Sequence, residues 1–278
     1  MTAPTALDSH PFIDGFVYGE GPRWHADRLW FTDGPAGKVY SVGEGEDLTV
    51  EAEVERPSGL GWLPDGTLVV SSLFAAKIHH VDAKTNAATT FDISDVAWST
   101  NDLLVTPGGY AYVDLYREGG GAIGFVDRSG AVRVVADGLE LPNGMCVLPD
   151  GQTLVVSETG GSRISSFRIE PDGSLGARGV FADLGPERHP DGLCVDAEGA
   201  VWVGCYDTGE FLRVMQGGNV THLVEIEGGW AVAPALGGAD GRTLYMVVDD
   251  TTHEGLMAGE STGWVVQTRV DVPGAGSP

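Results

Sequence analysis

The amino-acid sequence predicts an all-β fold, a six-bladed β-propeller with a central channel. A short apolar strand, a polar turn and a second strand recur six times along the 278 residues. Turn signals such as Asp-Gly stand just before several of these copies, and no long stretch has the 3.6-residue period of a helix. A repeat of roughly 40–45 residues built from short strands is typical of propeller blades.

The six copies follow one another without a linker and with even spacing. They cover residues 28–42, 67–82, 110–127, 153–170, 200–215 and 243–270. Matched positions lie 39 to 47 residues apart, namely Trp30, Val69, Tyr112, Val155, Trp202 and Tyr245. Asp-Gly favours a hairpin because the turn needs positive φ. We expect strands from both ends, Phe12–Tyr18 and Trp264–Val272, to close the ring.

The strongly acidic composition limits which partners the protein can bind. Lys plus Arg is 16 and Asp plus Glu is 40, which gives a formal charge of −24. Nucleic acid and anionic membrane surfaces are excluded as partners, because both need clustered basic residues. We expect no secretion signal, because residues 1–12 lack a basic stretch followed by an apolar one, and the three cysteines form no C-x-x-C. We expect one cytoplasmic domain over residues 1–278, with flexible tails at 1–11 and 273–278.

The residues that enter the first strand of each blade carry the candidate chemistry. In a propeller this strand lines the channel, so equivalent positions form a ring at one depth. The predicted ring consists of Glu20, Ser58, Asn101, Asn143, Asp191 and Gly229. Four of the six are carboxylates or amides, which suit a hard divalent cation such as Ca²⁺. A single Asn-Gly or Asp-Gly would only indicate a turn, but four blades in register favour a metal site.

The order and context of these motifs resemble the SMP-30/gluconolactonase/luciferin-regenerating-enzyme family. The resemblance runs from about residue 15 to 272 and is carried by residues 20–24 (EGPRW), 101–103 (NDL), 142–145 (PNGM) and 190–193 (PDGL). It implies a propeller with a divalent metal in the channel, and in most members a lactone hydrolase. It implies Glu20, Asn143 and Asp191 as direct metal ligands. It also implies that Asn101 faces metal-bound water or substrate and that Asp191 is the general base.

The predicted function is therefore a divalent-metal-dependent hydrolase that opens a lactone or a related ester. A divalent cation polarises a carbonyl and lowers the pKa of water, and a carboxylate beside it can transfer the proton. Ca²⁺ is the expected ion, and Mg²⁺, Mn²⁺ and Zn²⁺ are the alternatives, although Zn²⁺ usually takes His or Cys ligands. No P-loop motif is present in the sequence.

The substrate is expected to be rather hydrophobic. Sugar-lactone members of the family tend to carry an Arg two positions before the third-blade Asn, and here that position is Ser99. The candidate substrate-binding residues are Asn101, Trp98, Tyr116, Met145, Trp230 and His253. Three alternatives stay open at this point: an aldonolactone hydrolase, a metal-dependent lyase, hydratase or isomerase at the same site, and a non-catalytic propeller that binds a protein.

Overall fold

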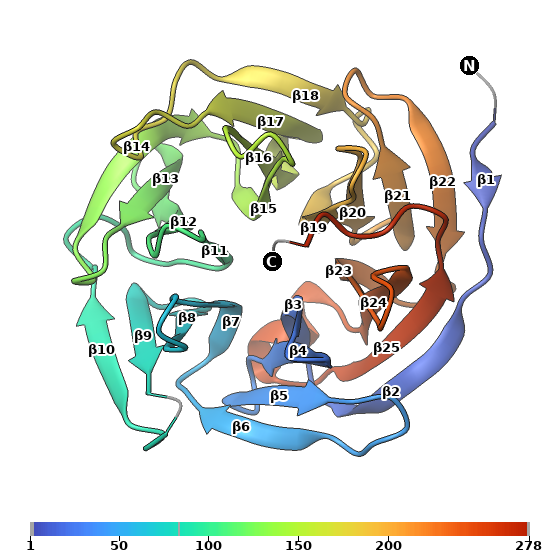
Figure 1. Ribbon diagram of the computed structural model, residues 1–278, viewed down its shortest axis with the longest axis horizontal. Coiled ribbons are helices and arrows are strands. Elements are labelled where there is room, and N and C mark those ends of the chain that lie inside the picture. The colour runs from blue at the N-terminus through green and yellow to red at the C-terminus, as the bar shows by residue number, and fades with distance from the viewer. Residues whose placement is uncertain (1–2, 83, 277–278) are drawn as a thin grey trace.

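A computed structural model describes residues 3–82 and 84–276. Six antiparallel sheets stand around a central channel like the blades of a propeller (Figure 1). Five sheets have four strands, and the sixth gains a fifth strand at its outer edge. The predicted six-bladed propeller is therefore confirmed.

Each blade begins at the channel and runs outward. The innermost strands are β3 (Gly19–His25), β7 (Pro57–Trp62), β11 (Leu103–Val105), β15 (Pro142–Val147), β19 (Pro190–Val195) and β23 (Trp230–Gly237). The second strands are β4 (Arg28–Asp33), β8 (Leu68–Ser72), β12 (Ala111–Arg117), β16 (Thr153–Glu158), β20 (Val201–Cys205) and β24 (Thr243–Asp250).

The outer strands complete the blades. The third strands are β5 (Lys38–Val42), β9 (Lys77–Val81), β13 (Gly120–Val126), β17 (Arg163–Arg168), β21 (Glu210–Val214) and β25 (Thr262–Arg269). The fourth are β6 (Thr49–Glu53), β10 (Ala88–Asp92), β14 (Val132–Leu139), β18 (Gly179–Asp183), β22 (Val220–Glu225) and β2 (His10–Phe16). Two short helices, η1 (Thr159–Gly161) and α1 (His253–Ala258), lie in connections. In the part of the chain described, no helix is long and apolar enough to cross a membrane.

Strands from both ends of the chain close the ring, as predicted. β2 pairs antiparallel with β25, with His10 opposite Gln267. β1 (Thr5–Ala6) adds in parallel to β22. The tail expected to be flexible at 273–278 is hydrogen-bonded over its described part, because the Pro273 carbonyl accepts from the Ala197 amide at 2.8 Å. Residues 1, 2, 277 and 278 lie outside the described residues, and the single-domain assignment stays a prediction.

Hydrophobic side chains fill the spaces between neighbouring blades. A second strand is covered on both faces, so β8 and β20 are buried along their whole length, and β20 is a nearly continuous apolar run. One core cluster joins Val155 of the fourth blade to Leu193 and Val203 of the fifth. Packing between blades therefore fixes how the innermost strands stand around the channel.

Glycines allow the innermost strands to approach one another closely. A Cβ atom at Gly144 would lie 2.6 Å from the Asp191 carbonyl oxygen, and one at Gly192 would lie 2.3 Å from the Ala233 Cβ. Such distances are too short for carbon atoms, so only glycine fits. This explains why Gly follows the ring residue in these blades, and it brings neighbouring ring side chains together.

Candidate metal centre and substrate cavity

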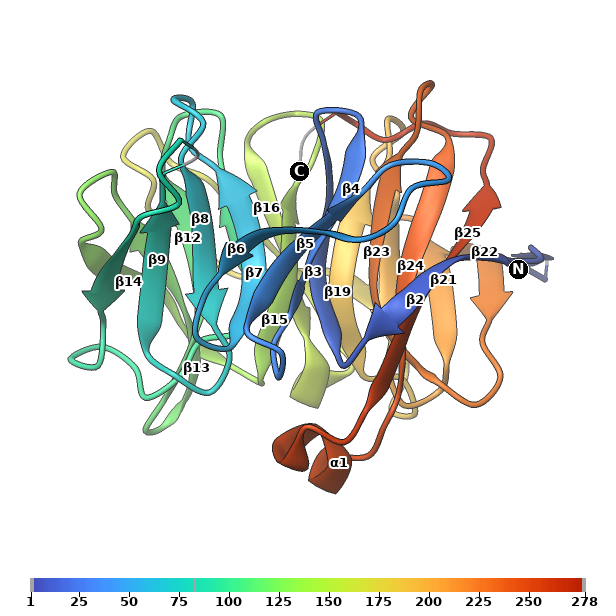
Figure 2. The ribbon, with the colours of Figure 1, turned by 90° about the horizontal axis from the view of Figure 1, so that it is seen from below.

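Four residues of the predicted ring line one cavity at the mouth of the channel. Glu20 is on β3, Asn143 on β15 and Asp191 on β19, whereas Asn101 lies just before β11. All four side chains are buried, and the cavity has a volume of about 340 Å³. Figure 2 shows α1 projecting from one face of the ring, and its residue His253 also lines this cavity.

The sixth position of the ring differs from the prediction. In the first blade Gly19 pairs with Asp33 of the second strand, and Glu20 follows. In the last blade Asp249 is the second-strand residue that corresponds to Asp33. It pairs with Trp230, so Trp230 corresponds to Gly19. Ala231 therefore takes the place equivalent to Glu20, and Gly229 precedes the strand.

A chain of side-chain hydrogen bonds orients two amides at the floor of the cavity. The Ser58 hydroxyl donates to Oδ1 of Asn101 at 2.5 Å. The Asn101 Nδ2 then donates to Oδ1 of Asn143 at 3.1 Å. A carbonyl oxygen has two lone pairs, so Asn143 Oδ1 keeps one for a further partner. The Oδ1 of Asn143 therefore has a lone pair available for a cation, while a hydrogen bond from the Asn143 side chain lowers the pKa of Asp191.

The two ring carboxylates stand in a strongly negative environment. Burial raises the pKa of Glu20 well above its usual value, and the charges of Asp191 and Asp102 act in the same direction. Burial also raises the pKa of Asp191 to about 8, with the charge of Asp102 as the next cause. A bound cation would favour the charged forms of both groups, because an opposite charge offsets desolvation and like-charge repulsion.

The residues present fit a divalent cation. The Oδ1 atom of Asp191 is buried and has no hydrogen-bond partner among the described residues. An acceptor in that state is costly unless a cation or donor occupies the space beside it. The oxygen donors of Glu20, Asn143 and Asp191 suit Ca²⁺, Mg²⁺ or Mn²⁺ better than Zn²⁺. Within residues 3–82 and 84–276 no three His, Cys, Asp or Glu side chains could hold a metal, so the amide belongs to the candidate set.

Buried acids on the second strands fix the backbone at the ring. Asp114 of β12 accepts hydrogen bonds from the backbone N–H groups of Asn101 at 2.6 Å and Asp102 at 2.9 Å. Asp249 of β24 accepts from the Gly19 amide at 3.1 Å, directly before Glu20. These carboxylates satisfy N–H groups where the chain enters the innermost strands, and so they set the positions of the ring side chains.

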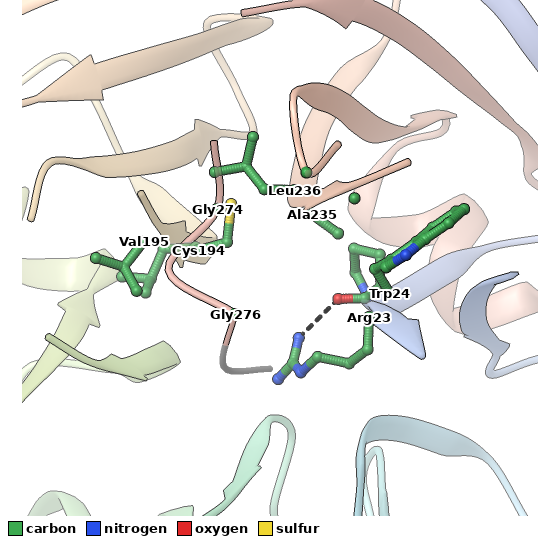
Figure 3. Close-up of a pocket in the computed structure, with 12 residues that line it drawn as sticks. Arg23, Trp24, Cys194, Val195, Ala235, Leu236, Gly274 and Gly276 are labelled. Carbon is green, nitrogen blue, oxygen red and sulfur yellow. Dashed lines mark hydrogen bonds between the residues drawn. The ribbon is translucent and has the colours of Figure 1, made fainter. Parts of the chain in front are cut away.

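A buried ion pair lies between the ring and the opposite end of the channel. Arg23 donates to Asp102 at 3.3 Å and to the carbonyls of Leu103 at 3.0 Å and Pro22 at 2.9 Å. Beyond it is a second cavity of about 210 Å³, also lined by Trp24 and Cys194. Figure 3 shows the Arg23 guanidinium beside the C-terminal segment at Gly276. The mouth cavity does not include Arg23, so access to the ring is from the α1 face.

Above the ring the cavity wall is largely apolar and aromatic. It consists of Tyr18, Leu73, Phe74, Tyr116, Leu141, Thr159, Tyr206, Trp230, His253, Leu256 and Met257. The rings of Tyr206 and Trp230 are 4.9 Å apart, and those of Trp230 and His253 are 5.0 Å apart. The Tyr116 hydroxyl donates to the Pro142 carbonyl at 3.1 Å.

The structure brings most of the predicted substrate-binding residues to this wall. Tyr116, Trp230 and His253 line it together with Asn101. Trp98 does not line it: its side chain is 65% exposed, and its ring lies 5.8 Å from that of Tyr116.

The prediction for Met145 is wrong. Its side chain is only 1% exposed and packs in the core with Leu104 and Tyr112. In a regular strand Met145 would share a face with Asn143. The register of β15 shifts between Pro142 and Met145, and such a bulge redirects the side chains that follow it. Met145 therefore points into the blade, while Asn143 points into the channel.

Several wall residues escaped the sequence reasoning, namely Tyr18, Leu141, Thr159, Tyr206, Leu256 and Met257. A usable signal existed for two of them, because Tyr18 stands two positions before Glu20 and Leu141 directly precedes the Pro-Asn-Gly motif. Ser99, by contrast, is buried and does not line the cavity, whereas Tyr116, its partner in an antiparallel bridge, does.

Comparison with known proteins gives consistent matches. A model of the SMP-30/Gluconolactonase/LRE-like region matches residues 18–249. A 6-deoxy-6-sulfogluconolactonase of Pseudomonas putida is 30% identical over 57% of this chain, and the match spans 56% of that relative. A pentonolactonase of Haloferax volcanii is 27% identical over 94% of this chain and 92% of its own length. The crystal structure of a calcium-binding protein, regucalcin, from Agrobacterium tumefaciens has a TM-score of 0.83 at 22% identity, covers 99% of both chains and shows the same fold.

Proposed function

Since the chain belongs to the SMP-30/gluconolactonase/LRE-like family, we propose that it is a divalent-metal-dependent hydrolase that opens lactones or related esters. Two relatives are named as lactonases, one of them over nearly the whole chain. The observation that carries the proposal is the convergence of Glu20, Asn143 and Asp191 at the floor of one cavity, with a buried oxygen of Asp191 left without a partner.

Glu20, Asn143 and Asp191 would hold the ion. When bound, a divalent cation supplies Lewis-acid polarisation of the ester carbonyl and makes water more acidic. Asp191 accepts a proton from the attacking water as the new C–O bond forms. The ring C–O bond then breaks, and Asp191 returns the proton to the leaving alkoxide. Opening of a lactone in this way gives a single hydroxy acid, and water is the only co-reactant.

Asn101 and Tyr116 are proposed to position the substrate. The Asn101 amide is held by Ser58 at 2.5 Å, so its Nδ2 is directed toward the ring. Tyr116 places a phenol on the cavity wall, and burial raises the pKa of this phenol well above its usual value. The phenol therefore stays neutral at physiological pH, and since its hydrogen is donated to the Pro142 carbonyl, its oxygen can accept a hydrogen bond from the substrate. Trp230 and His253 form another part of the wall, with their rings edge to face.

Ca²⁺ is the proposed ion, because two carboxylates and an amide carbonyl leave room for water and match its tolerance of mixed oxygen ligands. Mg²⁺, Mn²⁺ and Zn²⁺ remain the alternatives in the test. A rather hydrophobic lactone is the proposed substrate, supported by the apolar wall and by the uncharged Ser99–Tyr116 pair. An aldonolactone is the second candidate, favoured by the named activities of the two lactonase relatives.

A cytoplasmic location is part of the proposal. It is supported by Cys146, Cys194 and Cys205, which are all free thiols.

The experiment is lactone hydrolysis by the metal-stripped protein with Ca²⁺, Mg²⁺, Mn²⁺ and Zn²⁺ added back one at a time. The substrates are gluconolactone, dihydrocoumarin and alkyl-substituted lactones. Restored activity that is greater on the apolar substrates supports both parts of the proposal. Greater activity on gluconolactone would favour the aldonolactone. Metal binding without opening of any lactone would favour a lyase, hydratase or isomerase at the same site.

A further inference from the structure

Three apolar side chains at the rim of the mouth cavity are exposed to solvent. Phe74 is 39% exposed, Leu141 55% and Met257 59%. They come from separate connections, after β8, before β15 and within α1. Together with Trp98, Val50 and Val180 they make up the exposed large apolar side chains of the described chain. Half of that set therefore surrounds one opening, and apolar groups gathered in this way indicate a binding surface.

Two of the three rim residues have a backbone conformation that residues with a Cβ atom rarely adopt. Phe74 has φ of 59° and Leu141 has φ of 55°, both in the left-handed region. Leu141 also precedes Pro142, a position that normally requires extended backbone. Gly or Asn adopts this conformation with less strain. Strained non-glycine residues gather at ligand sites, where the surrounding structure holds them in place.

The surroundings of both residues do hold them. The Leu141 carbonyl accepts a hydrogen bond from the Thr159 amide at 2.9 Å, which anchors its turn to η1. The Arg56 guanidinium lies over the Phe74 ring, 5.9 Å from its centre, on a connection that also carries positive φ. These contacts therefore hold the Leu141 and Phe74 side chains in place at the rim.

Helix α1 supplies the third side of the rim. Its first turn is capped by Thr252, whose hydroxyl oxygen accepts from the Gly255 amide at 3.0 Å. Gly259, with φ of 72°, ends the helix. None of its residues is buried, yet Leu256 and Met257 line the cavity. The helix therefore adds little to the core and instead places two apolar side chains over the mouth.

We propose that Phe74, Leu141 and Met257 form a subsite for an unbranched alkyl substituent on the lactone ring. The inference rests on the proposed function, in which the polar floor takes the ester group. A substituent on a ring held there extends toward the rim, where it meets apolar side chains. A neutral chain fits better than a carboxylate-bearing one, because the protein has a formal charge of −24.

The expected signature is a dependence of kcat/KM on chain length. Each methylene buried on the rim should raise kcat/KM by roughly fourfold, until the chain extends past the rim into water. The gain should appear mainly in KM, because contacts far from the reacting atoms are the same in substrate and transition state.

The test uses the metal-loaded, full-length protein and four substrates: δ-valerolactone, δ-hexalactone, δ-octalactone and δ-decalactone. Leu141→Asn keeps a residue that tolerates the left-handed backbone but removes the apolar surface. Met257→Gln keeps side-chain length and adds polarity. Val180→Asn is the matched control, since Val180 is 61% exposed on β18 and does not line the cavity. Each rim variant should lose roughly tenfold or more on δ-decalactone and stay within about twofold on δ-valerolactone.

The outcomes separate the two proposals. If δ-valerolactone is opened but kcat/KM does not rise with chain length, the subsite is wrong and the hydrolase stands. If no lactone is opened with any metal, the proposed function fails. Light scattering on the same variants gives the remaining outcome. An oligomer that Leu141→Asn dissociates, with an unchanged chain-length dependence, would assign the rim to a second copy of this chain and overturn the subsite.

Discussion

The Asn101 side-chain amide donates a hydrogen bond to Oδ1 of Asn143 at 3.1 Å, across the boundary between two blades. Ser58, one blade further back, donates to the other end of the same amide at 2.5 Å. The oxygen and nitrogen of an amide have nearly the same shape, so the hydrogen bond from Ser58 decides which atom faces which neighbour. Three blades therefore determine the orientation of one candidate metal ligand.

Ser58→Ala should weaken metal binding and lower kcat/KM by roughly 10- to 100-fold, the usual effect of losing a group that orients a metal ligand. The Asn101 amide would then be free to turn its N–H groups away from Asn143. Titration calorimetry with Ca²⁺ and steady-state kinetics measure the two effects. Ser157→Ala is the control, because the Ser157 hydroxyl is buried, has no hydrogen-bond partner among the described residues and does not line the cavity. Equal effects from both variants would refute the positioning role of Ser58.

Asp191→Asn should lower kcat by roughly 10²- to 10⁴-fold, as expected when a general base is removed. The fold should survive, since the substitution removes a buried charge and keeps the shape of the side chain. Turnover and thermal unfolding are both measured. Asp207→Asn is the control, because Asp207 pairs with His189 at 2.5 Å outside the mouth cavity. Full activity in Asp191→Asn would exclude Asp191 as the base.

Glu20→Gln should reduce the affinity for the divalent cation, since a neutral amide oxygen replaces a charged ligand of a hard ion. Calorimetric titration of the stripped protein gives the affinity directly. Glu46→Gln provides the comparison, because Glu46 is a surface residue paired with Arg28 at 2.5 Å. An unchanged affinity in Glu20→Gln would remove Glu20 from the ligand set.

The metal-stripped protein should lose stability as pH rises from about 5 to 8. Burial raises the pKa of Asp191 to about 8 and raises that of Glu20 as well. The folded state then keeps protons that the unfolded chain releases near pH 4. The stabilisation is fully present below the unfolded pKa and disappears as pH rises through the folded pKa.

Urea unfolding at several pH values measures this dependence. Saturating Ca²⁺ should remove it, because a bound cation favours the charged carboxylates, and Asp191→Asn should make the slope smaller. A stripped protein that becomes more stable between pH 5 and pH 8 would contradict the assignment of a crowded, uncompensated acidic centre.

The blade repeat and the ring of polar residues could be predicted from the sequence because each depends on short segments that recur in every blade. Second strands are buried on both faces and rich in apolar residues, as in Val201–Cys205, and Gly follows the ring residue where blades approach closely. Glu20, Asn143 and Asp191 were found because equivalent residues of successive blades face one axis. The sequence pattern did not fix the depth of the last position, where the strand pairing makes Ala231, and not Gly229, the equivalent of Glu20.

The cavity wall was harder to predict because it depends on irregular backbone. A register shift in β15 turns Met145 into the core. The same shift recurs at the Gly after the ring residue in β3, β7 and β19, but strict alternation of side chains along a strand does not anticipate it. Leu141 reaches the cavity through left-handed backbone that its residue type disfavours. Met257 reaches it on α1, in the connection between β24 and β25, which is outside the repeating blade pattern.

The pairing of β2 with β25 has a consequence for how a newly made chain folds. β2 ends at Phe16, whereas β25 begins at Thr262. At roughly 5–20 residues per second, the ribosome needs on the order of tens of seconds to make the stretch between them. Throughout that time β2 is a strand without its partner, exposed to other nascent chains. Pro11 and Asp14 within β2 discourage such pairing, since Pro lacks an N–H and a charge resists burial at a sheet edge.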